Sequence, residues 1–558
     1  MRQALAVGLL AFGAATTAAP KTVCTITVNS SDEREVLKAT LPAGEFRFVE
    51  LVERGRPDWL ESACRQKVQC DALVISGHFD GGTEFYTDRT DDREYLPVHE
   101  MERVACSESC PGLFSQLKEV YLFGCNTLNA HAMRTASAEV PRSLVRAGHS
   151  PADAEALARV LSDRHGESNR DRMRHIFKDV PVIYGFPEKA PLGRYAGPLL
   201  ERYLRGGGQI ATGRADPKLL ATFSATAMTA TSGMTGADPR AGFRRDLCGF
   251  ADDRLDAARK IDHLHGLLGR DMAEVRLFLD HLERYTASLP PRAQEPVPVA
   301  RALGALAADA TTRERYLEFV RDADEPAVRV RMLALAQRWG WISAAEERRL
   351  VADVIGERLI AQAPGVGDVE LACSVNRDGT LDAELARLAP ATGAAGPAQS
   401  AMLACLGSAD GRAGVLRAWS GSNADDVLIA QAYLAHRPVA DALELRQVTA
   451  AVTRMTVTDA QVRALDALSR HRLDDEQTLR SLARLFAQTR SGDVQRATAN
   501  VLLRGNYAAI ATPEIVDVLR RKRIRGDGGD VVDVLLRRLA AAQAERPSPR
   551  AALEQRPF

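Results

Sequence analysis

Two short apolar segments constrain the fold of this chain more than any other feature. Residues 72–78 (ALVISGH) and 120–125 (VYLFGC) are β-prone runs that end at a glycine, followed by His78 in the first run and by Cys125 in the second. Uninterrupted apolar runs of this kind are typical of strands buried on both faces of a parallel sheet. Because ligands bind at the carboxyl ends of strands in open α/β sheets, the two side chains are candidates for a thiol active site.

Strand and helix patterns alternate around these two runs. Five apolar strand patterns are separated by helical ones, at residues 23–28, 46–52, 72–76, 120–123 and 180–186. Such alternation predicts crossover connections and a mostly parallel sheet with helices on both faces. We therefore expect an α/β domain over residues 22–210.

The first residues have the order of a secretory signal. Arg2 is followed by an apolar stretch at residues 4–12 and by small residues up to position 19. This order is typical of a cleaved signal peptide, and the apolar stretch is too short to span a bilayer. We expect residues 1–19 to be removed and the mature chain, without a membrane span, to be exported to the periplasm or the extracellular medium.

The chain contains nine cysteines, all of which follow the expected cleavage region. An odd number in an exported chain leaves at least one thiol unpaired, and Cys125 is the candidate. Cys106 and Cys110 lie in one short loop, where a small disulfide ring is expected. Zinc is the competing interpretation of this pair, but no second pair with ligand spacing accompanies it. We expect no metal and no cofactor.

The composition changes after the α/β pattern. Residues 211–248 are rich in Gly, Ala and Thr, which predicts a linker or a loosely packed extension. Residues 249–324 are expected to form a helical connector. The sequence therefore predicts an all-α region after the α/β domain.

Helical patterns recur further along the chain. Patterns that start at residues 427, 462 and 494 are 35 and 32 residues apart. Helix pairs at this period are similar to HEAT-type repeats, which stack into an α-solenoid. We expect such a helical-repeat domain over residues 325–540, followed by a disordered tail at 541–558.

His78 and Cys125 would lie close together if their strands were neighbours. Neighbouring strands are about 4.8 Å apart, so side chains just past their ends come within reach of each other. A free thiol is only slightly ionised at neutral pH, and a nearby imidazole makes it reactive by accepting its proton. The alternative is structural, because a single cysteine or histidine after a strand is commonly a packed core residue.

The order of strands and helices, with His78 after the third strand and Cys125 after the fourth, resembles the caspase-like (clan CD) cysteine peptidases. These include caspases, metacaspases, separase, gingipains and the bacterial CHAT proteases, and the resemblance covers residues 22–210. It implies that His78 is the general base and Cys125 the nucleophile that attacks a peptide bond, with an oxyanion site at the backbone of Gly77, Phe79 and Cys125. The family usually has glycine after the histidine, where this chain has Phe79.

The charge balance limits the partners that we expect. Lys and Arg total 73, as do Asp and Glu, and aromatic residues make up 5% of the chain. Neither number favours binding to nucleic acid. We expect a protein or peptide substrate and a protein regulator on the helical repeats.

The rival hypothesis is an inactive caspase-like scaffold whose helical repeats bind a protein partner. A thiol redox protein is disfavoured because Cys125 lacks a Cys-x-x-Cys motif.

Overall fold

The structure is a computed structural model, and it divides into two compact units, residues 1–324 and 325–558. The expected signal peptide lies outside the described residues except for residue 19, and the expected tail does so from residue 546 onward. The structure describes residues 19–52, 60–79, 82–87, 94–107, 110, 112–131, 144–145, 149–165, 167–361, 364–385, 395–524 and 531–545.

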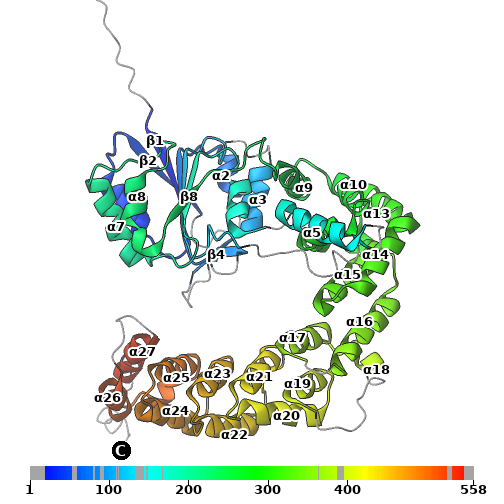
Figure 1. Cartoon of the computed structure of the whole chain (residues 1–558). Helices are drawn as coiled ribbons and strands as arrows, with labels where there is room; N and C mark the ends of the chain where they lie inside the picture. The colour runs from blue at the N-terminus through cyan, green and yellow to red at the C-terminus, as the bar shows by residue number, and fades with distance from the viewer. Residues whose placement is uncertain are drawn as a thin grey trace, which may run out of the picture. The chain divides into compact units, whose positions relative to one another are not determined.

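A six-stranded sheet forms the centre of the first unit (Figure 1). The strand order is β2-β1-β3-β6-β7-β8; all neighbours from β2 to β7 are parallel, and β8 is antiparallel to β7. The prediction of an α/β unit with a mostly parallel sheet is confirmed. The strands are β1 (Lys21–Thr27), β2 (Phe46–Val52), β3 (Ala72–Ser76), β6 (Glu119–Phe123), β7 (Val182–Gly185) and β8 (Thr229–Thr231).

Each face of the sheet buries its own apolar core. Because successive side chains of a strand point to opposite faces, Leu73 and Ile75 of β3 lie in one core, and Ala72 and Val74 lie in the other. This double burial explains the uninterrupted apolar run in the sequence. The first core is covered by α2 (Glu61–Arg65), α3 (Val98–Cys106) and α6 (Asn169–Ile176), and the second by α1 (Asp32–Thr40), α7 (Gly193–Arg205) and α8 (Pro217–Thr222).

Residues 211–248, expected to be a linker or a loosely packed extension, contribute a strand to the sheet and helices that pack beside it. The segment supplies α8, the edge strand β8 and most of α9 (Ala241–Ala251). Its small residues permit close packing rather than flexibility: a Cβ atom on Gly233 would lie 1.9 Å from the carbonyl oxygen of Phe177. Composition alone does not distinguish these two uses of small residues.

Four disulfides cross-link the chain and leave Cys125 as the free cysteine. The prediction of an unpaired Cys125 is confirmed. The predicted Cys106–Cys110 ring is wrong, because Cys106 ends α3 against α9 while Cys110 turns back toward α2. The pairs are Cys24–Cys70, Cys64–Cys110, Cys106–Cys248 and Cys373–Cys405.

Helices form the rest of the first unit, together with a small hairpin that follows β3. The hairpin pairs β4 (Glu84–Tyr86) with β5 (Tyr95–Pro97) in antiparallel fashion and leads directly into α3. The remaining helices are α5 (Pro151–His165), α10 (Ala257–Leu268), α11 (Met272–Leu277), α12 (Leu279–Ser288), α13 (Val297–Ala308) and α14 (Ala310–Asp322). No helix in the described part of the chain is long and apolar enough to cross a membrane.

The second unit is helical throughout its described residues. Helices α21, α23, α25 and α27 contact one another in sequence order, and α20, α22, α24 and α26 do the same. Each helix therefore packs mainly on near neighbours in the chain. The helices are α15 (Pro326–Trp339), α16 (Ala344–Leu359), α17 (Val366–Val375), α18 (Asp382–Leu385), α19 (Pro397–Cys405), α20 (Ala409–Trp419), α21 (Ala424–His436), α22 (Ala442–Val452), α23 (Thr458–Leu468), α24 (Glu476–Gln488), α25 (Gly492–Arg504), α26 (Pro513–Lys522) and α27 (Val531–Glu545).

One buried carboxylate anchors the segment after α7 to the sheet. Glu119, at the start of β6, is 1% exposed and accepts hydrogen bonds from the backbone N–H groups of Ala211 and Thr212, both 2.8 Å, and Gly213, 3.0 Å. It also accepts hydrogen bonds from the hydroxyl groups of Thr212 and Tyr121. These contacts hold residues 211–213 against the sheet.

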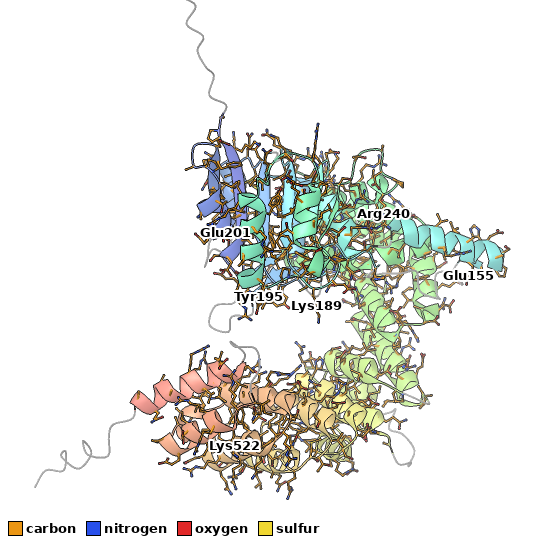
Figure 2. The ribbon with its side chains drawn as sticks, turned by 60° about the vertical axis from the view of Figure 1, so that its left-hand side comes forward. Glu155, Lys189, Tyr195, Glu201, Arg240 and Lys522 are labelled. Atoms are coloured by element: carbon orange, nitrogen blue, oxygen red, sulfur yellow. A yellow bond between two sulfur atoms is a disulfide. The ribbon has the colours of Figure 1, made fainter. Side chains whose placement is uncertain are left out.

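We expect Glu119→Ala to lower the free energy of unfolding of the first unit by about 3 kcal/mol, because it leaves several buried donors without an acceptor. Hydrogen exchange should become faster at the amides of residues 211–213. The matched control is Glu201→Ala on α7, whose side chain pairs at the surface with Arg205 and is labelled in Figure 2. Equal exchange in the two variants would contradict the anchoring role of Glu119.

Candidate functional site

The pairing of β3 with β6 brings His78 and Cys125 to the same edge of the sheet. The last register pair is Ser76 with Phe123, so each candidate residue lies two positions beyond a paired residue. The N–H of Gly77 donates to the carbonyl oxygen of Phe123 at 3.2 Å, which carries the pairing one residue further. The two side chains thus follow neighbouring strands at the same level, as expected from the sequence.

The residues next to the two candidates fit each other by size. A Cβ atom on Gly124 would lie 2.9 Å from the Cβ of Phe79 and 2.9 Å from the carbonyl oxygen of Gly77. Phe79 is fully buried, and its ring packs 4.5 Å from that of Phe85. Because side chains alternate along an extended chain, burial of Phe79 in one core directs His78 to the opposite face.

The Cys125 sulfur is half-buried and in contact with the segment after β7. The backbone N–H of Ala190 points at Sγ from 3.4 Å. The next N–H, that of Asn126, donates to the carbonyl oxygen of Glu188 at 2.6 Å. Two consecutive residues are therefore held by the same neighbouring segment, which fixes the position of the sulfur.

A sharp turn follows Cys125. Asn126 has a φ of +59°, in the left-handed region that asparagine tolerates better than most residues. The side-chain amide of Asn169, at the start of α6, donates to the carbonyl oxygen of Asn126 at 3.0 Å. The turn ends the strand at once and leaves Cys125 at its tip.

His78 is held by the hairpin that follows it. Its N–H donates to the carbonyl oxygen of Tyr86 at 2.9 Å, and the N–H of Tyr86 donates back at 3.0 Å. The two rings lie 5.4 Å apart between centroids. Strand β4 thus covers one side of the imidazole.

One of the three backbone N–H groups expected to bind an oxyanion is already used in the sheet. The N–H of Gly77 is used within the sheet, by its bond to Phe123. It is therefore not directed at a substrate, although the sequence suggested it as a donor. The N–H groups of Phe79 and Cys125 are the remaining candidates from that set.

A buried charge cluster supports the loops that carry both candidates, and the sequence analysis missed it. Arg172 of α6 bonds to Glu167 through Nη2 and Nε, at 2.6 and 3.0 Å, and also donates to the carbonyl oxygen of Gly82 in the loop after His78. Two residues after Glu167, Asn169 binds the turn at Asn126. The cluster thus connects the loop after His78 with the turn after Cys125.

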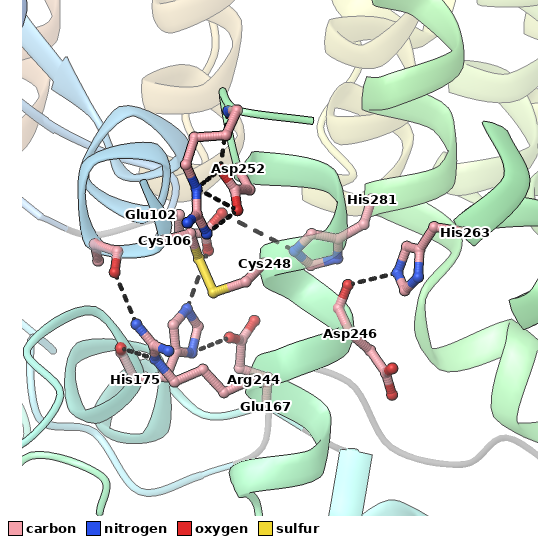
Figure 3. The surroundings of a disulfide bond; sticks show 12 residues. Glu102, Cys106, Glu167, His175, Arg244, Asp246, Cys248, Asp252, His263 and His281 are labelled. Carbon is pink, nitrogen blue, oxygen red and sulfur yellow. Dashed lines mark hydrogen bonds and ion pairs between the residues drawn. A yellow bond between two sulfur atoms is a disulfide. The ribbon is translucent and has the colours of Figure 1, made fainter. Parts of the chain in front are cut away.

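His175 lies between two carboxylates of this cluster (Figure 3). Its Nε2 is 3.5 Å from Glu102, and its Nδ1 is 3.3 Å from Glu167. Burial would raise the pKa of Glu102, but His175, His281 and Arg172 together hold it well below its usual range. Burial likewise opposes the charge on Arg172, yet Glu167 and Glu102 raise the pKa of that guanidinium.

These residues fit a cluster of ion pairs better than a metal site. One ligand atom from each of Glu102, Glu167 and His175 lies within 4.8 Å of the others. However, the two carboxylates face opposite nitrogens of the imidazole, and a single ion binds only one of these nitrogens. The guanidinium of Arg172 already neutralises Glu167, so a divalent cation would lie beside a buried positive charge.

A buried carboxyl group contacts the strand that ends at His78. Glu33 of α1 is 1% exposed and accepts a hydrogen bond of 3.0 Å from the hydroxyl of Ser76, the last residue of β3. Burial, with a smaller contribution from the charge of Asp32, raises the pKa of Glu33 to about 7. The folded protein therefore holds this proton at pH values where the unfolded chain has released it.

We expect stability to fall as pH rises from about 4.5 to about 7, because the folded-state pKa of Glu33 exceeds its value of 4.5 in the unfolded chain. Glu33→Gln should remove this loss and raise the free energy of unfolding at pH 8 by about 3 kcal/mol, with little effect near pH 4. Denaturant titrations at both pH values measure the difference. Glu35→Gln, an exposed position on the same helix, is the control, and the same curve in both variants would refute the assignment.

The comparisons with known proteins do not identify a family for the chain. No protein-family model, no curated protein and no solved structure matches it. The function is therefore inferred from the residues and contacts at this edge of the sheet.

Proposed function

We propose that the chain is a cysteine endopeptidase of the caspase-like type, with His78 and Cys125 as its catalytic dyad. The observation that carries the proposal is the in-register pairing of β3 and β6, since the two residues follow these strands at the same level. Cys125 is also the free thiol of a chain whose other eight cysteines are paired. A thiol left unpaired in such a chain suits a nucleophile.

In the proposed reaction, His78 accepts the proton of the Cys125 thiol, and the thiolate attacks the carbonyl carbon of a peptide bond. Backbone N–H groups of Cys125 and Phe79 would stabilise the negative oxygen of the tetrahedral intermediate. His78 then gives the proton to the leaving amine as the C–N bond breaks. Water hydrolyses the remaining thioester and restores the thiol.

The segment after β7 is suited to contact a substrate. Ala190 touches the Cys125 sulfur, and two apolar residues close to it in sequence, Leu192 and Tyr195, are 46% and 55% exposed. Figure 2 shows Lys189 and Tyr195 at the same edge of the first unit. We assign this segment to binding a peptide with an apolar side chain.

The second unit is proposed to be a HEAT-type α-solenoid that binds a protein substrate or regulator. The support is its packing, in which helices of two series contact successive members of their own series. Export to the periplasm or the extracellular medium is part of the same proposal. Its support is the four disulfides, which persist in oxidising compartments.

We expect Cys125→Ala to abolish peptide cleavage and His78→Ala to reduce it at least about 100-fold, because the first removes the nucleophile and the second its base. The measurement is cleavage of a peptide library by the purified mature protein. His149→Ala, at an exposed position, is the matched control and should keep wild-type activity. Wild-type rates in either dyad variant would rule out the dyad.

Labelling with an iodoacetamide probe distinguishes the enzyme from the rival, an inactive scaffold whose helical repeats bind a partner. Without reductant, Cys125 is the free thiol, so the label reports on one site. Fast labelling of the native protein, slowed in His78→Ala, is expected for an activated thiol. Labelling only after unfolding, together with no cleavage of any library peptide, would favour the scaffold.

A further inference from the structure

A pocket of about 360 Å³ opens among the helices of the first unit. Leu247 and Phe250 of α9 and Tyr285 of α12 provide apolar walls, and all three side chains are more than nine-tenths buried. The Cys106–Cys248 disulfide joins α3 to α9 beside it (Figure 3). The volume and the aromatic lining are typical of sites for small organic ligands.

The charged groups of this pocket are mostly paired with one another. Its two acids, Glu102 and Asp253, lie 3.4 Å from Arg284 and 3.3 Å from Arg103 respectively. The arginine in each pair also lines the pocket. These pairs leave no carboxylate available to neutralise a further cation.

Lys260 of α10 is the positive charge that these pairs do not neutralise. Its ammonium group is half-buried and makes no hydrogen bond or ion pair with any residue that the structure describes. Asp252 and Asp253 interact electrostatically with Lys260 but form their ion pairs with Arg254 and Arg103. Burial lowers the pKa of Lys260, and the charges of Asp252 and Asp253 oppose this shift.

A histidine lies in the same pocket. Burial and, to a smaller extent, the charge of Arg284 lower the pKa of His99 of α3, while the charges of Glu102 and Glu100 oppose this shift. A bound anion would reverse this effect and would also replace the water lost by the ammonium group. A bound cation would add to the charge of Lys260 with no free carboxylate to oppose it.

We propose that this pocket binds a small carboxylic acid with an aromatic or branched apolar body. The carboxylate pairs with Lys260, and the apolar body packs against Leu247, Phe250 and Tyr285. None of these residues belongs to the proposed dyad. Binding here uses no catalytic residue, although Glu102 and His175 of the buried charge cluster also line the pocket.

Calorimetry with 2-naphthoate as the probe tests the proposal, and 2-naphthalenemethanol, which has the same ring system without the charge, is the comparison. We expect the acid to bind at least tenfold more tightly than the alcohol, which corresponds to about 1.4 kcal/mol. Lys260→Met should remove this preference, and Lys260→Arg should retain it. The control Lys218→Met, at an exposed position, and Cys125→Ala should bind like the wild type.

A second variant tests the location of the site. Ala251→Phe places a bulky side chain in the pocket wall and should block both probes while Lys260 remains. Thermal melting of each variant shows whether it is folded. Equal binding of acid and alcohol, unchanged binding in Lys260→Met, or no binding of the acid at millimolar concentration would each overturn the proposal.

Discussion

The parallel pairing of β3 with β6 is the constraint on which the candidate site depends. Two segments separated by more than forty residues end at the same level because their apolar side chains share the same two cores. A shift of one residue would move these side chains to the wrong faces of the sheet. The burial that stabilises the sheet therefore also determines which residues meet at its edge.

The close packing of Phe79 against Gly124 shows how the core extends to the residues beside His78 and Cys125. The Cβ of Phe79 occupies the space that a Cβ at position 124 would need. The bulk of Phe79 is thus accommodated by the glycine that follows the neighbouring strand.

Local patterns in the sequence were sufficient for the parts of the fold that depend on local burial. The strands that end before His78 and Cys125, the helices on both faces and the unpaired Cys125 follow from apolar runs and an odd cysteine count. The disulfide partners of Cys106 and Cys110 did not follow, because pairing depends on which helices meet in space. The packing of residues 211–248 did not follow either, since it depends on contacts with a distant carboxylate, that of Glu119.

The charge cluster was missed for the same reason. Glu102 lies on α3, far in sequence from Glu167 and Arg172, and no spacing in the sequence marks it as their neighbour. His175 is one turn of helix from Arg172, a pattern that is common on solvated helix surfaces. Only the folded chain shows that this turn is buried and that it holds the loops beside the candidate dyad.

The Cys106–Cys248 disulfide has a consequence for the covalent integrity of the first unit. The bond joins two cysteines that are 142 residues apart in sequence, and the loop that it closes includes the whole region from β6 to β8. If the backbone is cut once within this loop, by the protein itself or by another peptidase, the two fragments remain one molecule until the disulfide is reduced. A matured or nicked form would therefore keep its mass and its sheet in an oxidising medium, and it would separate into two chains on a reducing gel.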